Sequence, residues 1–374
     1  MGDIQKMKIS LIAPKSNGKD GIGTYCEELN QVLGREIETS RIGFPSGTQT
    51  LLDLLRSSAQ GITDNSKIVH LQYEYGLFGP KSLYSFIIIP LLYLGTRVYK
   101  KKFIITLHEV LNSNSVEGSN YYLKRYYLVV LNHILVYFSD HIILLSDVAE
   151  DRLTKCTSTK SYSVLTHGSN AHSSLTVSKQ EAKVELGYTP DDPVVVEPGY
   201  IEPRKGCDIV SKVASNLPDV SFVLAGGKKE TYSEYYNNIL DESPDNLEIT
   251  GTLPMPKFLQ YIRAADIALL PYQTAVQGGI RNRVTQSGVF NQCAAQSTPV
   301  IASDNQYFNQ INSEFGCIIT VNSSDPREIE NEIKSLLADP DRQSRLGENI
   351  FEYSQSNSME EVAKDHVEIY MSTV

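Results

Sequence analysis

Short apolar runs rich in isoleucine and valine recur along the chain, and longer amphipathic stretches separate them. In the first half the runs are Lys8–Ala13, Ile68–Gln72, Phe103–Leu107, His141–Ser146 and Tyr162–Thr166. In the second half they are Pro193–Glu197, Ser221–Ala225, Leu247–Thr250, Ile267–Pro271, Pro299–Ser303 and Cys317–Thr320. Uninterrupted apolar strands are typical of parallel sheets covered on both faces, and strands that alternate with helices indicate βαβ units. The pattern predicts an α/β protein with doubly wound parallel sheets.

This rhythm weakens once, in the polar stretch Ala171–Asp192, and 374 residues are enough for two domains. We therefore expect a Rossmann-like domain over residues 1–172 and a second one over residues 190–355. Residues 356–374 follow a Ser/Asn-rich break and contain a predicted helix, Met359–Tyr370. Polar residues follow many of the strands, and ligands bind beyond the carboxyl ends of such sheets. The pattern thus predicts a cleft between two facing domains.

Composition excludes several classes of protein. The chain has 34 Lys+Arg and 44 Asp+Glu, so its net charge of −10 argues against sequence-independent nucleic-acid binding. Its five cysteines are odd in number and form no Cys-x-x-Cys pair, and no His-Glu-x-x-His occurs. Neither a disulfide framework nor a metal site is indicated. The chain opens without a secretory signal, because Lys6-Met7-Lys8 runs directly into the first strand, so we expect a cytoplasmic protein.

Three motifs of the first half carry candidate chemistry. Gly21-Ile22-Gly23 opens a helix where backbone N–H groups can meet a phosphate, but Cys26 replaces the third glycine of a dinucleotide fingerprint, so a tight turn remains open. His108-Glu109 ends a very apolar strand, where a polar pair is costly unless it is exposed at a site or hydrogen-bonded. A histidine that binds substrate or transfers a proton and a structural histidine both fit. Tyr73-Glu74 presents the same choice with a weaker signal.

Two motifs of the second half are suited to phosphate. Arg204-Lys205 lies at a strand-to-helix turn, although a solvated surface pair is the alternative. Gln286-Ser287-Gly288-Val289 precedes a helix that Ser287 can cap, and the free N–H groups there can hold a pyrophosphate. An ordinary capped helix is the alternative, but Arg281 and Arg283 lie just upstream and favour an anion.

Taken in order, these motifs resemble those of the GT-B glycosyltransferases, specifically the retaining enzymes of the family 4 type. The resemblance spans nearly the whole chain and is colinear. The segments that carry it are Gly21–Tyr25, His70–Gly79, Thr106–His108, His167–Asn170, Gly199–Gly206, Val223–Gly227, Thr250–Leu253 and Ala265–Tyr272.

The resemblance implies two Rossmann-like domains, of which the second binds a nucleotide-sugar donor and the first binds most of the acceptor. It implies that the final helix crosses back to the first domain. It also implies a reaction without metal or other cofactor, in which cations and helix N-termini hold the diphosphate. Preorganised N–H groups and cations would stabilise the charge that develops on the departing phosphate.

Individual roles follow from matching positions. His108 matches the histidine near the transferred sugar and is the catalytic candidate. Lys205 matches the lysine that contacts the donor phosphates, and Gly21 and Gly23 match the loop that faces them. The remaining donor candidates are Tyr200, Arg204, Gly226, Leu253, Gln286, Ser287, Gly288, Val289 and Gln292, and the acceptor candidates are Tyr73, Glu74 and Glu109.

Three positions depart from the family pattern. The donor-motif arginine falls on Tyr200, although Arg204 can compensate. Two glutamates of the family fall on Val284 and Gln292; Gln292 can still hydrogen-bond to a ribose, whereas Val284 cannot contact sugar hydroxyls. The main interpretation is a metal-independent retaining transferase acting on a glycan, lipid-linked or cell-envelope acceptor. A catalytically impaired GT-B protein with a binding or scaffolding role stays open, as does, less favoured, a nucleotide-sugar epimerase.

Membrane contact is a further open question. Phe86–Leu94 and Tyr126–Leu145 are the most apolar segments, but one is too short and the other too interrupted to span a bilayer, so we expect both to be buried. A basic group near several tyrosines can dock on an anionic lipid surface at the inner face of the membrane, or form an ordinary solvated face. Its cations are Arg97, Lys100, Lys101, Lys102, Lys124 and Arg125.

Overall fold

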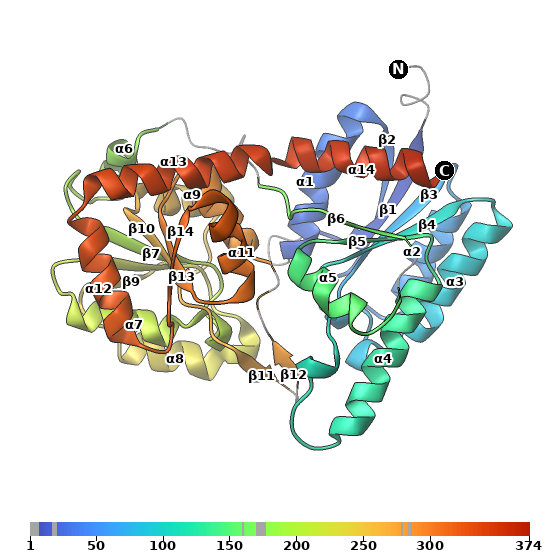
Figure 1. Ribbon diagram of the computed structural model, residues 1–374, viewed down its shortest axis with the longest axis horizontal. Coiled ribbons are helices and arrows are strands. Elements are labelled where there is room, and N and C mark those ends of the chain that lie inside the picture. Colours follow the sequence, from blue (N-terminus) through green and yellow to red (C-terminus); the bar gives the residue numbers. More distant parts are fainter. Residues whose placement is uncertain are drawn as a thin grey trace. The chain divides into compact units, whose positions relative to one another are not determined.

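The structure is a computed structural model that describes residues 7–16, 21–158, 161–169, 177–277, 280–282, 284 and 286–374. The chain divides into two units, each with its own sheet (Figure 1). The first unit comprises residues 1–167, 278–280 and 359–374, and the second comprises residues 168–277 and 281–358. The final helix α14 (Met359–Thr373) thus belongs to the first unit.

The first unit contains a six-stranded parallel sheet in the order β2-β1-β3-β4-β5-β6. Its register pairs Ile12 with Ile42 on one side and with Leu71 on the other. The strands are β1 (Lys8–Pro14), β2 (Glu38–Phe44), β3 (Ile68–Tyr73), β4 (Lys102–Leu107), β5 (His141–Leu144) and β6 (Tyr162–Val164). The helices besides α14 are α1 (Gly21–Glu36), α2 (Leu51–Thr63), α3 (Ser85–Val98), α4 (Tyr121–Tyr137) and α5 (Asp147–Thr154).

Two apolar cores lie in this unit, because its central strands are buried on both faces. One core joins α2, α3 and α4 to the sheet through residues such as Leu71, Leu92 and Leu131. The other joins α1 and α14 through residues such as Leu29 and Tyr370, which are fully buried. The final helix therefore covers the same core as α1.

The helices α3 and α4 correct one expectation. Both were predicted to be buried, but Ile87 and Leu94 of α3 are 50% and 59% exposed and Tyr126 of α4 is 69% exposed. One face of each helix packs on the core while the other carries apolar side chains into solvent. No described helix is both long and apolar enough to span a bilayer.

The second unit contains another six-stranded parallel sheet, in the order β14-β13-β10-β7-β8-β9. Its strands are β7 (Val194–Pro198), β8 (Ser221–Ala225), β9 (Leu247–Ile249), β10 (Ile267–Leu270), β13 (Val300–Ser303) and β14 (Ile318–Val321). Its helices are α6 (Lys179–Glu185), α7 (Cys207–Asn216), α8 (Ser233–Asp241), α9 (Met255–Ala264), α10 (Gly288–Ala295), α11 (Gln306–Phe315), α12 (Pro326–Leu337) and α13 (Pro340–Ser356). A two-stranded ladder, β11 (Ala275–Gln277) and β12 (Ile280–Asn282), lies between β10 and α10 in sequence.

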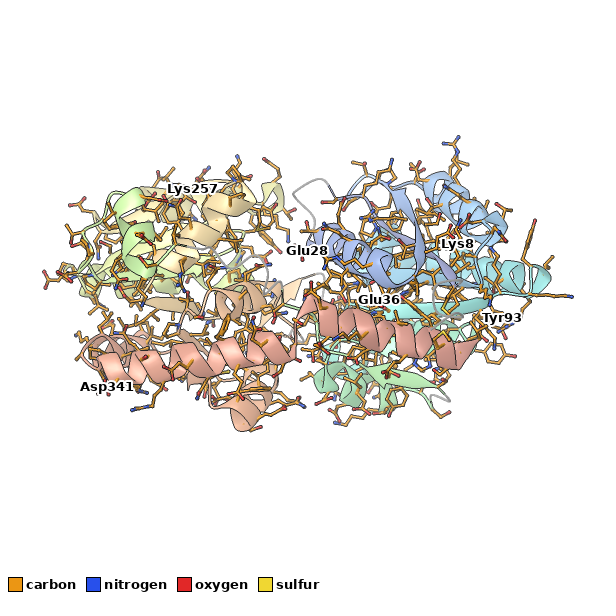
Figure 2. The ribbon with its side chains drawn as sticks, turned by 90° about the horizontal axis from the view of Figure 1, so that it is seen from above. Lys8, Glu28, Glu36, Tyr93, Lys257 and Asp341 are labelled. Carbon is orange, nitrogen blue, oxygen red and sulfur yellow. The ribbon has the colours of Figure 1, made fainter. Side chains whose placement is uncertain are left out.

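Figure 2 draws the side chains of the described residues on the helices and strands of both units. In the second unit the core includes Val195, Phe222 and Leu269 from the strands. Two Rossmann-like, doubly wound parallel sheets were predicted, and both are confirmed. The cleft predicted between them stays a prediction.

Candidate active site

His108 lies directly after β4 in the first unit. Its backbone N–H donates to the Tyr73 carbonyl at the end of β3, and its Nε2 is 2.8 Å from Gln72 Oε1. The side chain is only 4% exposed, and burial, with a contribution from nearby His167, lowers the pKa of His108 to about 3. His108 is therefore neutral, and it can donate from one ring nitrogen and accept at the other.

The start of α1 lies close to this histidine. The Tyr25 ring meets His108 edge-on at 5.4 Å between centroids, and it lies 4.4 Å from the His167 ring. Gly23 faces the backbone of Lys15, which would be 3.0 Å from an added Cβ, whereas a Cβ on Gly21 meets no described atom within 4 Å. The predicted loop and histidine are thus brought together. Residues 17–20 lie outside the described residues.

The acceptor candidates separate into two groups. Glu74 and Glu109 are partly exposed at the ends of β3 and β4. Tyr73 is fully buried; its ring stacks on Phe78 at 4.6 Å and its hydroxyl is 3.0 Å from Ser85 Oγ. The structure places Tyr73 in the core rather than at an acceptor surface, because the strand turns its side chain inward.

In the second unit, Lys205 lies in the short 3-10 helix Pro203–Lys205 after β7 and is 5% exposed. Its Nζ donates to the Tyr272 hydroxyl at 2.9 Å and to the Pro198 carbonyl at 3.2 Å. Burial alone would lower the pKa of Lys205, but its polar contacts, first of all with the Tyr272 hydroxyl, outweigh burial and raise that pKa. The ammonium group is therefore fixed and charged.

Tyr272 joins this lysine to the start of α10. The Tyr272 hydroxyl is 2.9 Å from Ser287 Oγ, and Ser287 caps α10 by accepting a bond from the Phe290 N–H at 3.1 Å. Lys205, Tyr272 and Ser287 thus form one hydrogen-bonded chain, which we call the Lys205–Ser287 chain. It brings together two motifs that lie 82 residues apart in sequence, and Tyr272 was not among the predicted site residues.

The buried carboxyl group of Glu197 lies close to Lys205. Glu197 Oε1 lies 3.9 Å from Lys205 Nζ, and Cys207 Sγ lies 3.5 Å from Glu197 Oε2. Burial raises the pKa of Glu197 to about 8, and Lys205 offsets only part of that rise. Glu197 is therefore protonated at neutral pH, which leaves the positive charge of Lys205 unneutralised.

Arg204 lies beside Lys205 but is paired differently. Its guanidinium donates to Glu202 at 2.9 Å, and Lys229 donates to the other oxygen of the same carboxylate at 2.8 Å. Burial works against ionisation of Glu202, but Arg204 and Lys229 hold its pKa below the ordinary value. Two cations share one anion, so this group keeps a net positive charge beside Lys205. Lys229 was also not predicted.

Close backbone approaches explain the glycines of this motif. A Cβ on Gly226 would lie 1.9 Å from the Gly199 carbonyl oxygen. Gly199 has a φ of +119°, and its added Cβ would meet Lys205 Nζ at 2.8 Å and Val289 at 3.4 Å. The predicted residues Lys205, Gly226 and Val289 therefore lie close to Gly199, and neither glycine leaves space for a larger side chain.

The other donor candidates are placed with less detail. Tyr200, Leu253, Gln286 and Val289 are partly exposed, and Gly288 is exposed at the first position of α10. Gln292, one turn further along α10, has a buried Oε1 with no hydrogen-bond partner among the described residues. Arg283 and Asn170 lie outside the described residues.

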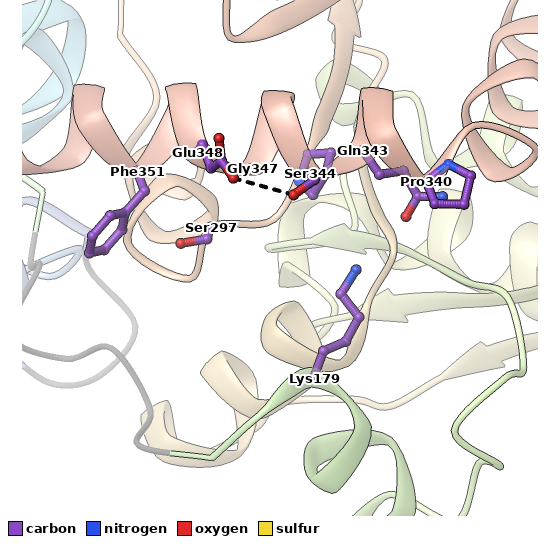
Figure 3. Close-up of a pocket in the computed structure, with 9 residues that line it drawn as sticks. Lys179, Ser297, Pro340, Gln343, Ser344, Gly347, Glu348 and Phe351 are labelled. Atoms are coloured by element: carbon purple, nitrogen blue, oxygen red, sulfur yellow. Dashed lines mark hydrogen bonds between the residues drawn. The ribbon is translucent and has the colours of Figure 1, made fainter.

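A separate pocket of about 400 Å³ opens in the second unit (Figure 3). Its lining includes Lys179, Ser297, Gln343, Ser344 and Glu348, and none of the predicted site residues. Lys179 Nζ lies 3.2 Å from Asp266 Oδ1, so the positive charge of this lysine is balanced by an ion pair. Within the described ranges, no group of three His, Cys, Asp or Glu side chains is arranged to hold a metal ion.

The chain also resembles known proteins in sequence and in fold. A family model described as glycosyl transferases group 1 matches residues 178–353. Sucrose-phosphate synthase from Thermosynechococcus elongatus has the same fold, with a TM-score of 0.75, 17% identity and coverage of 98% of this chain and 99% of that chain. HepE from Anabaena, solved in complex with UDP, superimposes with a TM-score of 0.74 and 13% identity over 98% of this chain and 100% of that chain.

The match in the second unit and the shared two-sheet fold together support a GT-B glycosyltransferase. The resemblance inferred from the colinear motifs is thereby confirmed at the level of the fold and of this broad family. The group 1 match covers the unit that holds the Lys205–Ser287 chain.

Two curated relatives align over shorter stretches. Alpha-galactosylglucosyldiacylglycerol synthase from Streptococcus pneumoniae is 31% identical over 94 residues, which are 24% of this chain and 25% of that protein. A GDP-mannose-dependent monoacylated phosphatidylinositol monomannoside mannosyltransferase from Corynebacterium glutamicum is 25% identical over 173 residues, 45% of this chain and 44% of that protein. The aligned part spans between a quarter and less than half of these relatives.

Proposed function

We propose that the protein is a metal-independent, retaining glycosyltransferase of the family 4 type that moves a sugar from a nucleotide diphosphate sugar to a lipid-linked or other envelope glycan acceptor. The observation that carries this proposal is the Lys205–Ser287 chain. It fixes a buried ammonium group beside the N-terminus of α10. A cation and free helix N–H groups held at one place suit a diphosphate.

The chemistry follows from what these groups can stabilise. When the bond between the sugar and the diphosphate breaks, negative charge grows on the leaving phosphate. Lys205 would meet that charge, and Arg204 and Lys229 would add a positive field. Since Glu197 is protonated at neutral pH, it would not cancel Lys205. His108, neutral in its buried site, would hydrogen-bond to the transferred sugar or the acceptor. We expect no metal and no cofactor beyond the co-substrate.

Transfer and its stereochemistry can be tested together. The protein is incubated with UDP-, GDP- and ADP-sugars, a chelator and vesicles that contain a glycolipid acceptor, and the product is followed by proton NMR. We expect one donor to be consumed and the new glycosidic bond to keep the anomeric configuration of the donor. An inverted product would contradict the retaining assignment, and donor binding without any product would favour the impaired, scaffolding alternative.

The acceptor side is supported by a surface on α3 and α4. Leu83 just before α3, and Ile87, Leu91, Leu94 and Val98 within it, are between 38% and 78% exposed, and the spacing of the last four places them along one side of α3. Tyr122, Leu123 and Tyr126 of α4 are at least 69% exposed. The two helices contact each other, with Phe86 and Tyr127 rings 5.5 Å apart. We call these eight exposed residues the α3–α4 surface.

We infer that this surface docks on an anionic lipid bilayer at the cytoplasmic face. Lys81, Lys100 and Arg125 are exposed on or beside α3 and α4, although the chain as a whole carries a net charge of −10. Exposed apolar side chains with nearby cations suit an anionic interface. The names of both relatives refer to glycolipids, which supports an acceptor in the membrane.

Vesicle sedimentation tests this docking. We expect the protein to pellet with phosphatidylglycerol vesicles and to stay in solution with phosphatidylcholine alone. The double variant Leu94→Glu/Val98→Glu should lose binding, whereas Leu240→Glu, at a residue that is 51% exposed on α8, should keep it. Equal pelleting of the three proteins, or no pelleting of the wild type, would contradict the proposal.

A further inference from the structure

An unbroken chain of buried hydrogen bonds runs from His108 to the final helix. Gln72 Oε1 is 2.8 Å from His108 Nε2, and Gln72 Nε2 is 3.2 Å from His70 Nε2. His70 Nε2 is also 2.7 Å from Thr106 Oγ1, and His70 Nδ1 is 2.7 Å from the Tyr370 hydroxyl. Gln72, His70, Thr106 and Tyr370 are fully buried. These four hydrogen-bonded side chains are therefore shielded from solvent.

The Gln72 amide links the tautomers of the two histidines. Its oxygen can only accept, so His108 Nε2 carries the hydrogen; its nitrogen can only donate, so His70 Nε2 carries a lone pair. The hydrogen of His70 then lies on Nδ1, where it donates to Tyr370. Both rings are neutral, because burial lowers the pKa of each well below its ordinary value. A change of tautomer at one ring therefore requires a change at the other.

We propose that Gln72 is a positioning residue for His108, and that Tyr370 of α14 sets, through His70 and Gln72, which ring nitrogen of His108 carries the hydrogen. This inference rests on the proposed role of His108 beside the sugar. With the hydrogen on Nε2, the lone pair lies on Nδ1, which can accept a hydrogen bond from a sugar or acceptor hydroxyl. The C-terminal helix would thus act on the reacting centre from 262 residues further along the chain.

Loss of the Tyr370 hydroxyl should reverse this arrangement. His70 Nδ1–H would lose its acceptor, and an unmet buried donor is costly. Moving the hydrogen to His70 Nε2 lets it donate to Thr106 Oγ1. Gln72 must then turn its oxygen toward His70 and its NH2 group toward His108. His108 Nε2 would become the acceptor, and its hydrogen would move to Nδ1.

The tautomers can be read directly by NMR of protein labelled with nitrogen-15 at histidine, without any substrate. His108 is identified by its loss in His108→Gln. We expect the hydrogen on Nε2 of His108 in the wild type and on Nδ1 in Tyr370→Phe. The matched control is Tyr75→Phe, which removes a bond of 2.6 Å to Asn132 in the same unit and should leave the His108 signals unchanged.

Kinetics give a second, separate readout. Gln72→Met keeps the side-chain length but removes both hydrogen bonds, so kcat should fall at least about tenfold while the donor KM changes less than about threefold. A wild-type His108 with its hydrogen on Nδ1, or identical His108 signals in the wild type and Tyr370→Phe, would overturn the inference. A protein that consumes no nucleotide sugar would contradict the proposed function alone, since the spectra still report the chain.

Discussion

Replacing Glu197 with glutamine removes a buried titrating group without changing its shape. The folded protein holds the Glu197 proton until about pH 8, because the side chain is fully buried, whereas the unfolded chain releases it near the ordinary pKa of 4.5. Folding therefore takes up a proton between these values, and the stability that this group contributes is full below pH 4.5 and falls as the pH rises to about 8.

The magnitude follows from the difference between the two pKa values. At about 1.4 kcal/mol per unit, the loss relative to the protonated state is about 1 kcal/mol at pH 5 and about 4 kcal/mol at pH 7.5. Glu197→Gln does not titrate at this position. We therefore expect the variant to gain about 3 kcal/mol over the wild type between pH 5 and pH 7.5.

The assay is urea denaturation of both proteins at several pH values, with the difference in free energy of unfolding plotted against pH. Glu202→Gln serves as the contrast, because Arg204 and Lys229 hold the pKa of Glu202 below its ordinary value. Above pH 4.5 the wild type should keep a higher free energy of unfolding than Glu202→Gln, and this difference should shrink only as the pH falls below that value. A flat difference for Glu197→Gln, or one that favours the wild type at high pH, would show that Glu197 is ionised and paired with Lys205.

Four other substitutions test the second and first units. Lys205→Met should weaken binding of the nucleoside diphosphate by about ten- to a hundredfold in calorimetry, because it removes one charged hydrogen-bond donor, and unchanged affinity would place the phosphates elsewhere. Ser287→Ala should lower the free energy of unfolding by about 1 kcal/mol through the lost cap, and no change would argue against the capping bond. Gly226→Ala should lower the free energy of unfolding by roughly 3 kcal/mol or more, because the added Cβ would lie 1.9 Å from the Gly199 carbonyl oxygen. Gly34→Ala in α1 should raise it by about 0.5–1 kcal/mol, since the nearest atom would be 3.7 Å from the added Cβ. The reverse order in urea denaturation would contradict this packing.

The apolar runs predicted the central strands because burial on both faces leaves a continuous signal in the sequence. The edge strand β2 was missed, since most of its residues are only partly buried and Arg41 interrupts the pattern. The exposed faces of α3 and α4 were missed for a related reason. Hydrophobicity predicts burial in a protein core, and it does not distinguish a core from a surface that meets another apolar phase.

The sequence could indicate some residues of the candidate site but not others. Arg204, Lys205 and Ser287 could be named as candidates because strand-to-helix turns concentrate cations and capping residues. The sequence did not predict Tyr272 and Gln72 as site residues, because a tyrosine after a strand and a glutamine within one resemble core residues until their partners are known. The side chain of Tyr73 could not be assigned either, since adjacent residues of a strand point to opposite faces.

Equilibrium titration of the protein with UDP, GDP and ADP, by calorimetry in the presence of a chelator, tests the central claim most directly. The account predicts that one of the three binds without metal and that Lys205→Met weakens that binding at least about tenfold. A folded protein that binds none of them, or that binds one only when a divalent cation is added, would contradict it.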